Sequence, residues 1–356
     1  MATSKPRRFT GPWRLTDLKQ VPSNGLTAFS CFHCGGGSTM GYKLAGFQML
    51  GGVEIDPEMM AIYRANHKPK HSYLMGVQEF NTLPLDELPD ELKNLDLLDG
   101  SPPCSVFSMA GKRDKKWGSE HHFREGQQKQ RLDDLFMHFI EVGRQLQPKV
   151  IVAENVKGLI LGNAKGYVKE IFAAFRDAGY DAQLFLFNAA RMGVPQVRER
   201  TFFIAQRRDL EWRKLTMRFD EQPISVREAW EGLSKQQAKS IKGEMLDAWK
   251  WCKSEDRKFI YEYFTMHLKT KKKLFNHNRI RWWQPSLTVT SSQDILHPSE
   301  PRHLSNKEIT RLQSFPDDYD FGKFSTRYVC GMSVPPFMTQ RVALEIGRQW
   351  FGVEYD

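Results

Sequence analysis

The sequence predicts an α/β fold, in which a doubly wound, mostly parallel sheet is joined to a second, smaller domain. Short apolar strands alternate with helical patterns from Leu26 to about residue 206, and such alternation is typical of parallel sheets with helices on both faces. Beyond residue 206 the alternation stops, and residues 207–285 are rich in Lys, Arg, Trp and Gln. Ligands of doubly wound sheets bind at the carboxyl ends of strands, so polar residues at those ends are the candidates for a site.

The expected elements follow from apolar periodicity, with prolines and glycines as boundaries. Pro57 opens one helix and Gly179 closes another, as their backbone preferences favour. Apolar residues in 132–146 recur with the period of a helix. We expect strands at 26–32, 49–55, 95–98, 150–153, 182–187 and 201–205. We expect helices at 37–45, 57–66, 132–146, 168–177, 305–313 and 336–350.

These patterns divide the chain into four parts. Residues 1–25 form a basic, poorly patterned leader, and residues 26–206 form the α/β domain. Residues 207–300 form the smaller domain, and residues 301–356 form a C-terminal segment whose last helix returns to the α/β domain. The aromatic residues of the smaller domain are expected to form its core: Trp249, Trp251, Tyr261, Tyr263 and Phe264.

Charge and cysteine content limit the class of protein. The chain has 356 residues, with 52 Lys and Arg against 42 Asp and Glu, a net charge of +10. This balance favours a polyanionic partner, although a basic protein without such a partner is the alternative. Five cysteines in a chain of this length do not form a disulfide framework. No apolar run suits a membrane helix, and the N-terminus lacks a signal-peptide core, so we expect a cytoplasmic protein.

A glycine-rich turn after the first strand predicts a nucleoside site. Gly35, Gly36 and Gly37 lie between a strand and a helix, where backbone N–H groups favour anions and nucleotides. Glu54 and Asp56 end the next strand about twenty residues later, a position suited to hydrogen bonds with ribose hydroxyls. The alternative is a plain tight turn beside a solvated acid.

Cys104 is the candidate nucleophile. It follows Pro102 and Pro103 directly after a strand, and the prolines stiffen the backbone that presents it. A free thiol has a pKa of about 8.5, so a positive neighbour or a helix N-terminus is expected to raise its thiolate fraction. The alternative is an inert, buried cysteine.

Two further motifs fall at strand ends. Glu154-Asn155-Val156 ends the strand at 150–153, where an acid acts in proton transfer or caps a helix. Gln196, Arg198 and Arg200 open the strand at 201–205 and share one face of an extended chain. Two arginines on that face form an array of donors for a phosphate, a carboxylate or a base carbonyl, unless they are a solvated strand edge.

Taken in order, these motifs resemble those of the bacterial and phage cytosine-5 DNA methyltransferase family. The resemblance covers residues 26–206 and 285–350. Its most specific part is the set Pro-Pro-Cys, Glu-Asn-Val and Gln-x-Arg-x-Arg. The other matching runs are Phe32 to Gly37, Glu54-Ile55-Asp56, Arg302-His303-Leu304-Ser305, Arg311-Leu312-Gln313-Ser314-Phe315-Pro316 and Gly331-Met332-Ser333-Val334-Pro335.

The resemblance implies a Rossmann-like methyltransferase sheet and transfer of a methyl group from S-adenosylmethionine to carbon 5 of a flipped cytosine. It makes 26–206 the catalytic domain and 207–300 a target-recognition domain. It implies catalytic roles for Cys104, Glu154, Arg198 and Arg200. It places the cofactor at Phe32, Gly35, Gly36, Gly37, Glu54, Ile55, Val77, Pro102 and Ser333. It places DNA at Ser108, Lys112, Arg113, Gln196, Lys272 and Arg281.

The chain departs from the family pattern around the donor site. The family opening Asp-x-Phe-x-Gly-x-Gly has Ser30 in place of the acid and Cys34 in place of a glycine. Val77 stands where the family often has an acid, and Met332 where it usually has Asn. Ser314 replaces a common glycine. These departures bear on donor binding rather than on the reaction.

The resemblance further implies double-stranded DNA as the partner, a monomeric enzyme in a bacterial or phage-infected cytoplasm, and room for a companion restriction nuclease. No metal is expected, because Cys31 and Cys34 have no second ligand pair at metal spacing. The alternatives are a tRNA cytosine-5 methyltransferase of the same family and a catalytically dead DNA-binding homologue. Methylation of an exocyclic amine is disfavoured, because Cys104 stands where such enzymes have an aromatic residue.

Overall fold

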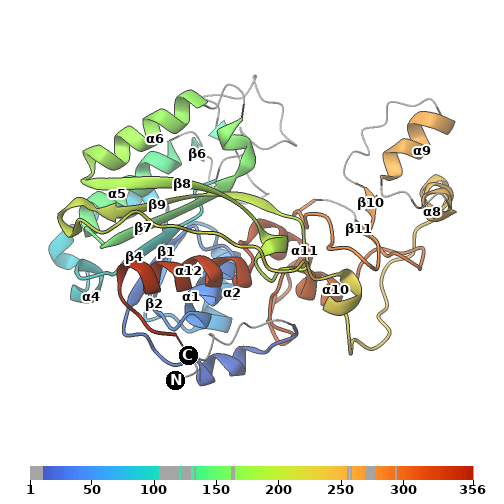
Figure 1. The fold of residues 1–356 in the computed structure, drawn as a ribbon, viewed down its shortest axis with the longest axis horizontal. Helices are drawn as coiled ribbons and strands as arrows, with labels where there is room; N and C mark the ends of the chain where they lie inside the picture. The colour runs from blue at the N-terminus through green and yellow to red at the C-terminus, as the bar shows by residue number, and fades with distance from the viewer. Residues whose placement is uncertain are drawn as a thin grey trace.

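The computed structural model describes residues 11–103, 120–121, 130–131, 134–161, 165–254, 256, 259–268, 277–292 and 295–355. Its centre is a seven-stranded sheet in the order β3-β2-β1-β4-β7-β9-β8 (Figure 1). The strands are β1 (Thr27–Cys31), β2 (Gln48–Glu54), β3 (His71–Leu74), β4 (Leu97–Gly100), β7 (Val150–Val156), β8 (Tyr180–Asn188) and β9 (Glu199–Arg207).

The sheet is mostly parallel, as predicted. Strands β3, β2, β1, β4 and β7 pair in parallel, whereas β9 runs antiparallel to both of its neighbours, β7 and β8. Strand β3 was not predicted. Its four residues are partly or fully exposed at the sheet edge, so the apolar run that identified the other strands is missing there.

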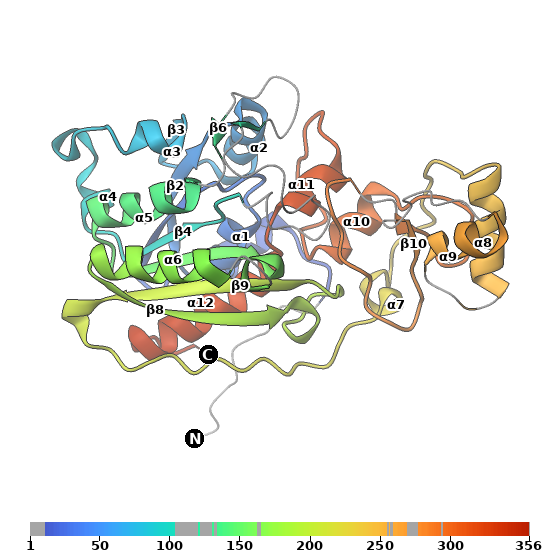
Figure 2. The same cartoon turned by 90° about the horizontal axis from the view of Figure 1, so that it is seen from above.

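Helices cover both faces of the sheet (Figures 1 and 2). One face carries α1 (Gly37–Leu44), α2 (Pro57–His67) and α12 (Pro336–Trp350), and the other carries α3 (Val77–Phe80), α4 (Asp90–Lys93), α5 (Leu135–Leu146) and α6 (Lys165–Asp177). A Cβ atom at Gly41 would lie 2.4 Å from Cβ of Thr339. This glycine therefore lets α12 pack directly on α1.

The smaller unit has a hydrophobic core of its own, at the right of Figure 1. It contains α8 (Glu244–Ser254) and α9 (Ile260–His267), and the short strands β10 (Asn278–Arg279) and β11 (Ile295–Leu296). Trp249 and Phe264 are buried in this core, and Trp251 and Tyr263 pack against it. The buried members of the core are Ile241, Ala248, Trp249, Cys252, Ile260, Phe264 and Leu296.

This separate core begins later along the chain than residue 207. Residues 208–233, with α7 (Val226–Ala229), pack on the α/β domain. Trp212 stacks on Trp350 with ring centroids 5.6 Å apart, and Glu221 forms an ion pair with Arg341 at 3.0 Å. After the small unit the chain returns through α10 (Asn306–Leu312) and α11 (Thr326–Met332), which join the main core.

The N-terminal segment is better ordered than its prediction as a patternless leader. From Gly11 onward it is described, with a 3-10 helix at Leu15–Gln20. Trp13 is buried in the main core, and its indole Nε1 donates to Ser314 O at 2.9 Å. Leu15, Leu18 and Val21 also pack against this core, so aromatic and aliphatic side chains together anchor the segment. Within the described ranges, no helix is long and apolar enough to cross a membrane.

Candidate active site

Three of the predicted motifs meet at the ends of neighbouring strands. In the parallel pair β4 and β7, Gly100 lies opposite Ala153, so Pro102 and Asn155 leave the sheet side by side. The Asn155 side-chain amide donates to Pro102 O at 3.1 Å. On the other side of β7, Arg200 of β9 lies opposite Val156. The Pro-Pro, Glu-Asn-Val and Arg-x-Arg runs therefore form one site.

Glu154 and Arg200 form a buried ion pair at this site. Arg200 Nε lies 2.8 Å from Glu154 Oε1, and the two side chains are 14% and 10% exposed. Burial lowers the pKa of Arg200, and the neighbouring Glu154 carboxylate opposes this shift. Arg200 Nη1 also donates to Glu199 O at 2.8 Å. The pair places a carboxyl group next to a fixed cationic donor.

Five of the predicted site residues lie outside the described residues: Cys104, Ser108, Lys112, Arg113 and Lys272. Pro103, the residue before Cys104, is the last described residue of this segment. Pro102 is buried and Pro103 is half-buried, and both follow β4 at the edge of the sheet where Glu154 and Arg200 lie.

The glycine loop, residues 32–37, is tied to the predicted ribose acid. Cys34 N donates to Glu54 Oε2 and Asp56 N donates to Glu54 Oε1, both at 3.0 Å. Burial raises the pKa of Glu54 to about 7, although these backbone donors oppose the shift. Asp56 has a different task, because its side chain accepts from the backbone N–H groups of Glu58 and Met59 at the start of α2. Glu54 is therefore the acid that faces the loop.

The glycines of this loop are required by packing as well as by backbone shape. A Cβ atom at Gly35 would lie 2.1 Å from Val329 Cγ1, and one at Gly37 would lie 2.1 Å from Val334 O. Gly36 has φ +74° and its Cβ would lie 2.3 Å from His67 Nε2. The loop is thus enclosed by α2 and by the segment that ends α11.

Cys34 has a backbone conformation that is typical of glycine. Its φ is +46°, in the left-handed region that L side chains rarely occupy. Its thiol lies 3.6 Å from Met59 Sδ, and burial raises its pKa to about 12. This side chain therefore occupies a backbone conformation that glycine adopts at lower cost.

The other predicted cofactor residues are placed unevenly around the loop. Phe32 has φ +55° and packs near Phe139, with ring centroids 6.5 Å apart. Ile55 is half-buried and lies against Gly76, while Ser333 is buried next to the Cys34 thiol. Val77 is 3% exposed and belongs to the apolar core. The structure therefore gives the Val77 side chain a packing role, unlike the predicted one.

Gln196 does not have the position that the DNA-contact prediction requires. Its side chain is fully buried; Nε2 donates to Gln313 Oε1 at 2.7 Å and Oε1 accepts from Val289 N at 2.9 Å. Gln313 in turn donates to Ser333 O at 2.8 Å. This buried amide network attaches the C-terminal segment to the strand that carries Arg200, so the prediction is corrected to a structural role.

Arg198 is corrected in the same way. It is 2% exposed, and its guanidinium donates to three carbonyls of the returning segment. Nη1 binds Val289 O at 2.8 Å, and Nη2 binds Gly331 O at 3.0 Å and Ser333 O at 3.1 Å. All three acceptors are backbone groups of the chain itself. Arg198 therefore holds the site together, whereas Arg200 faces Glu154.

Arg281, a predicted DNA contact, belongs to the small unit. It is half-buried, and its Nε lies 3.1 Å from Asp256 Oδ1. Asp256 also lies 3.4 Å from the buried Arg279. Among the described residues no group of three or more His, Cys, Asp or Glu side chains could hold a metal ion.

Sequence reasoning missed Asp99, which belongs to a group of polar side chains on one face of the sheet. On the face covered by α1, strands β1, β4, β7 and β9 each carry an apolar side chain and, two residues away and closer to the site, a polar one. The apolar residues are Ala28, Leu97, Val152 and Phe202, and the polar ones are Ser30, Asp99, Glu154 and Arg200. Asp99 is 3% exposed. An acid within the apolar run Leu97-Leu98-Asp99 was the available signal.

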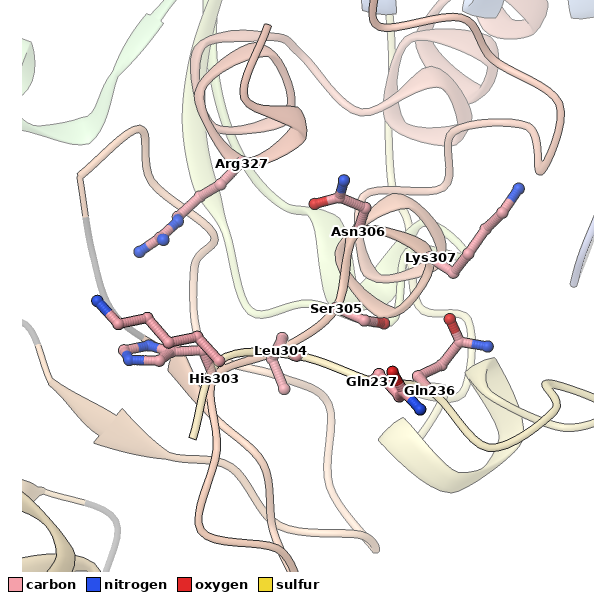
Figure 3. Close-up of a pocket in the computed structure, with 10 residues that line it drawn as sticks. Gln236, Gln237, His303, Leu304, Ser305, Asn306, Lys307 and Arg327 are labelled. Carbon is pink, nitrogen blue, oxygen red and sulfur yellow. The ribbon is translucent and has the colours of Figure 1, made fainter. Parts of the chain in front are cut away.

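A basic hollow lies where α10, the start of α11 and the segment at 236–239 come together (Figure 3). Its volume is about 500 Å³, and it is lined by residues 236–239, 303–307 and Arg327. Lys239, Lys307, Arg327 and His303 contribute nitrogen-bearing side chains, and none of the lining residues is an acid. Such a surface favours a polyanion.

Comparisons with known proteins agree with this arrangement. The family model for C-5 cytosine-specific DNA methylases matches residues 26–348. The type II methyltransferase M1.HphI of Haemophilus parahaemolyticus is 30% identical over 89% of this chain and 86% of its own length. M.FnuDI of Fusobacterium nucleatum is also 30% identical, over 83% of this chain and 86% of its own length.

Solved structures share the fold. A putative DNA modification methyltransferase from an Escherichia coli prophage has a TM-score of 0.68 at 21% identity, covering 91% of this chain and 99% of its own. Spodoptera frugiperda DNMT2 has a TM-score of 0.62 at 14% identity, covering 90% and 99%. The match of the family model to most of the chain decides the assignment. The chain belongs to the family of C-5 cytosine-specific DNA methylases and is a DNA (cytosine-5) methyltransferase.

Proposed function

We propose that this enzyme transfers a methyl group from S-adenosylmethionine to carbon 5 of a cytosine flipped out of duplex DNA, through a covalent bond between Cys104 and carbon 6. The observation that carries the proposal is the meeting of three motifs at adjacent strand ends. Glu154 and Arg200 are 2.8 Å apart, and Pro102 is held to Asn155 beside them. Cys104 follows two residues later in the sequence.

These residues suit the reaction because carbon 5 of cytosine is a poor nucleophile. Addition of the Cys104 thiolate to carbon 6 forms a C–S bond and moves electrons toward N3 and O2. In its protonated form Glu154 donates to N3, and the Arg200 guanidinium donates to O2, so both stabilise the charge that forms. Carbon 5 would then take the methyl group from the sulfonium of the donor, whose S–CH3 bond breaks with its electrons returning to sulfur, so that S-adenosylhomocysteine leaves. Loss of the carbon 5 proton to a base reforms the ring double bond and expels the thiolate.

The described residues fit the methyl donor. S-adenosylmethionine, when bound, supplies an electrophilic methyl group. The buried Glu54 carboxylate accepts from Cys34 N and Asp56 N, and because a carboxylate has about four lone-pair sites, it retains acceptor capacity for a ribose hydroxyl. Phe32 and Ile55 provide apolar surface beside Glu54, and the glycine loop runs into the start of α1. We therefore place the donor across the ends of β1 and β2.

The other cysteines are poor nucleophiles, which favours Cys104. Burial raises the thiol pKa of Cys31 and Cys330 far above the ordinary value, and that of Cys34 to about 12. Cys252 is buried in the small unit, where its thiol lies 3.7 Å from Phe259 O. A thiolate is needed for attack. Of the five cysteines, Cys104 alone follows the strand end that carries the site.

We infer that the basic hollow and the small unit hold the DNA. A base in a duplex must be flipped out before a thiolate can reach carbon 6, at a cost of a few kcal/mol. Contacts with phosphates position the duplex without specifying its sequence. Lys239 and Arg327 line the basic hollow. The enzyme is proposed to act as a monomer, with residues 207–300 contributing the target-recognition surface.

Trapping with 5-fluorocytosine tests the mechanism. Duplex DNA that carries this base cannot release a proton from carbon 5, so wild-type enzyme with donor should form a complex that resists denaturation. Cys104→Ser should form none, and peptide mapping should locate the bond at Cys104. Absence of a complex with wild-type enzyme would contradict the covalent mechanism.

A substrate comparison separates the alternatives. Transfer of labelled methyl groups to duplex DNA should exceed transfer to tRNA, and bisulfite sequencing of the DNA should give the target site. Transfer to tRNA alone would favour the tRNA branch of the family. DNA binding with no transfer would favour a dead homologue.

A further inference from the structure

We propose that Asp99 is a positioning residue that fixes the donor-binding loop against the strand leading to the nucleophile. The inference rests on the proposed function, because it assigns Asp99 to the donor side of the same reaction. It concerns a buried carboxyl that the mechanism above does not use.

The contacts of Asp99 join three elements. Ser30 Oγ of β1 and Ser38 Oγ of α1 both donate to Asp99 Oδ2 at 2.7 Å, and Tyr42 OH of α1 donates to Oδ1 at 3.1 Å. Ser38 is the second residue of α1, directly after the glycine loop. Asp99 itself is followed by Gly100, the end of β4, and then by the Pro-Pro-Cys turn. One carboxylate thus links both parts of the site.

The environment of Asp99 is costly for a carboxylate. The side chain is 3% exposed, Ser30 is fully buried and Ser38 is 5% exposed. Burial raises the pKa of Asp99 to about 6, the charge of Glu154 adds to the rise, and the three hydroxyls oppose it. If position 99 only had to accept hydrogen bonds, the neutral amide of Asn would serve without the cost of a buried charge. The presence of Asp at this position therefore favours a role in the site, because the carboxylate lowers the stability of the fold.

The register of the sheet explains the serine at position 30. The family pattern has an acid there, and this chain has Ser30 directly opposite Asp99 in the parallel pair β1 and β4. Paired residues of neighbouring strands direct their side chains to the same face. The carboxyl of this chain therefore reaches the start of α1 from the adjacent strand, and the serine hydroxyl completes its contacts.

This exchange of positions suggests the decisive variants. Asp99→Ser and Ser30→Asp are each made alone, and the double variant Ser30→Asp/Asp99→Ser restores one carboxyl to the pair. Asp96→Asn is the matched control. Asp96 is also a buried acid next to β4, but it lies at the opposite end of the strand, where it binds Thr27 and Lys149.

Donor affinity is measured by calorimetry with S-adenosylmethionine, and kcat and the donor KM by methyl transfer to DNA. Asp99→Ser should weaken donor binding about 10- to 100-fold, the usual effect of losing hydrogen bonds to a charged group. The double variant should recover most of that loss. Asp96→Asn should lower the melting temperature but leave the donor KM within about twofold of wild type, because it touches no part of the site.

Asp99→Asn keeps the size of the side chain and gives a second readout if Asp99→Ser folds poorly. Wild-type donor affinity should fall as the pH falls through about 6, and this component should be absent in Asp99→Asn. The titratable groups facing Asp99 are Tyr42 on α1, Tyr63 on α2, Cys31 on β1 and Glu154 on β7. Glu54 titrates in both proteins, so the difference between them isolates Asp99.

Unchanged donor affinity in Asp99→Ser or Asp99→Asn would overturn the inference, as would a double variant no better than Asp99→Ser. Failure of the proposed function gives a different result. Wild-type enzyme would then transfer no methyl group to DNA, while the donor affinities of the variants could still be compared.

Discussion

The end of the sheet that carries the site and the basic hollow use charge in different ways. At the sheet edge Glu54, Asp99 and Glu154 are buried, Arg200 is half-buried, and all four have fixed partners. Cationic side chains line the open basic hollow, with no acid among the lining residues. The first arrangement fixes atoms for chemistry, which tolerates little displacement. The second suits an extended polyanion, for which summed charge matters more than the place of any one group.

The contrast is sharpest between Arg198 and Arg200, two residues apart on one strand. Arg198 donates to three backbone carbonyls, and Arg200 pairs with the predicted catalytic acid. We expect Arg200→Ala to lower kcat about 100- to 1,000-fold, the usual cost of removing a donor from developing charge. The change in the unfolding free energy of the variant should be smaller than the change in activation free energy that corresponds to its loss of kcat. Single-turnover methyl transfer and urea denaturation measure the two effects.

Arg198→Met is the matched partner of that variant. It leaves Val289, Gly331 and Ser333 carbonyls without their donor, and each such buried group costs about 1–3 kcal/mol. The expected result is a large loss of stability with kcat retained in the fraction that folds. Near-normal turnover of Arg200→Ala would contradict the assignment of Arg200 to the reaction. A stable Arg198→Met enzyme that has lost turnover would contradict the assignment of Arg198 to a structural role.

The pH dependence of the unfolding free energy tests whether the ionised carboxylate of Asp99 lowers the stability of the protein. Folding raises the pKa of Asp99 to about 6, so the folded state binds its proton more tightly than the unfolded chain does. The contribution of protonated Asp99 to the stability of the folded state is complete below the unfolded pKa of about 4, and it is lost as the pH rises through about 6. At pH 8 the ionised group costs on the order of 3 kcal/mol.

Asp99→Asn cannot titrate, so its comparison with wild type isolates this effect. Relative to Asp99→Asn, wild-type stability should improve as the pH is lowered from 8 to 5 in urea denaturation series. Glu54, whose pKa burial raises to about 7, adds a similar slope to both proteins. A difference between the two proteins that does not change with pH would show that Asp99 is not ionised at a cost.

The sequence supported prediction of the fold but not of the division of labour at the site. Short runs of apolar residues identified six of the seven strands, because a strand that is buried on both faces is apolar throughout. It could not separate Arg198 from Arg200, since their roles depend on carbonyls at Val289 and Gly331 that come together only in the folded chain. Gln196 was misplaced for the same reason. Asp99 was overlooked because its partners lie on two other elements.

The smallest expected effects are in the basic hollow. Lys239→Ala and Arg327→Ala should each weaken DNA binding about threefold to tenfold and reduce the slope of log Kd against log salt by about 1. Neither variant should alter kcat at saturating DNA, because neither residue belongs to the sheet edge. Lys93→Ala, on α4 at the far end of the sheet from the small unit (Figure 2), is the control with the same change of charge.

Fluorescence anisotropy across a salt series distinguishes a local contact from a general effect of net charge. If Lys93→Ala reduced the slope as much as Lys239→Ala, the basic hollow would have no special place in DNA binding. If Lys239→Ala and Arg327→Ala together removed a slope of about 2, they would report two separate phosphate contacts. Loss of kcat in either of these variants would link the hollow to the chemistry, and the separation between a rigid edge that reacts and an open hollow that binds would fail.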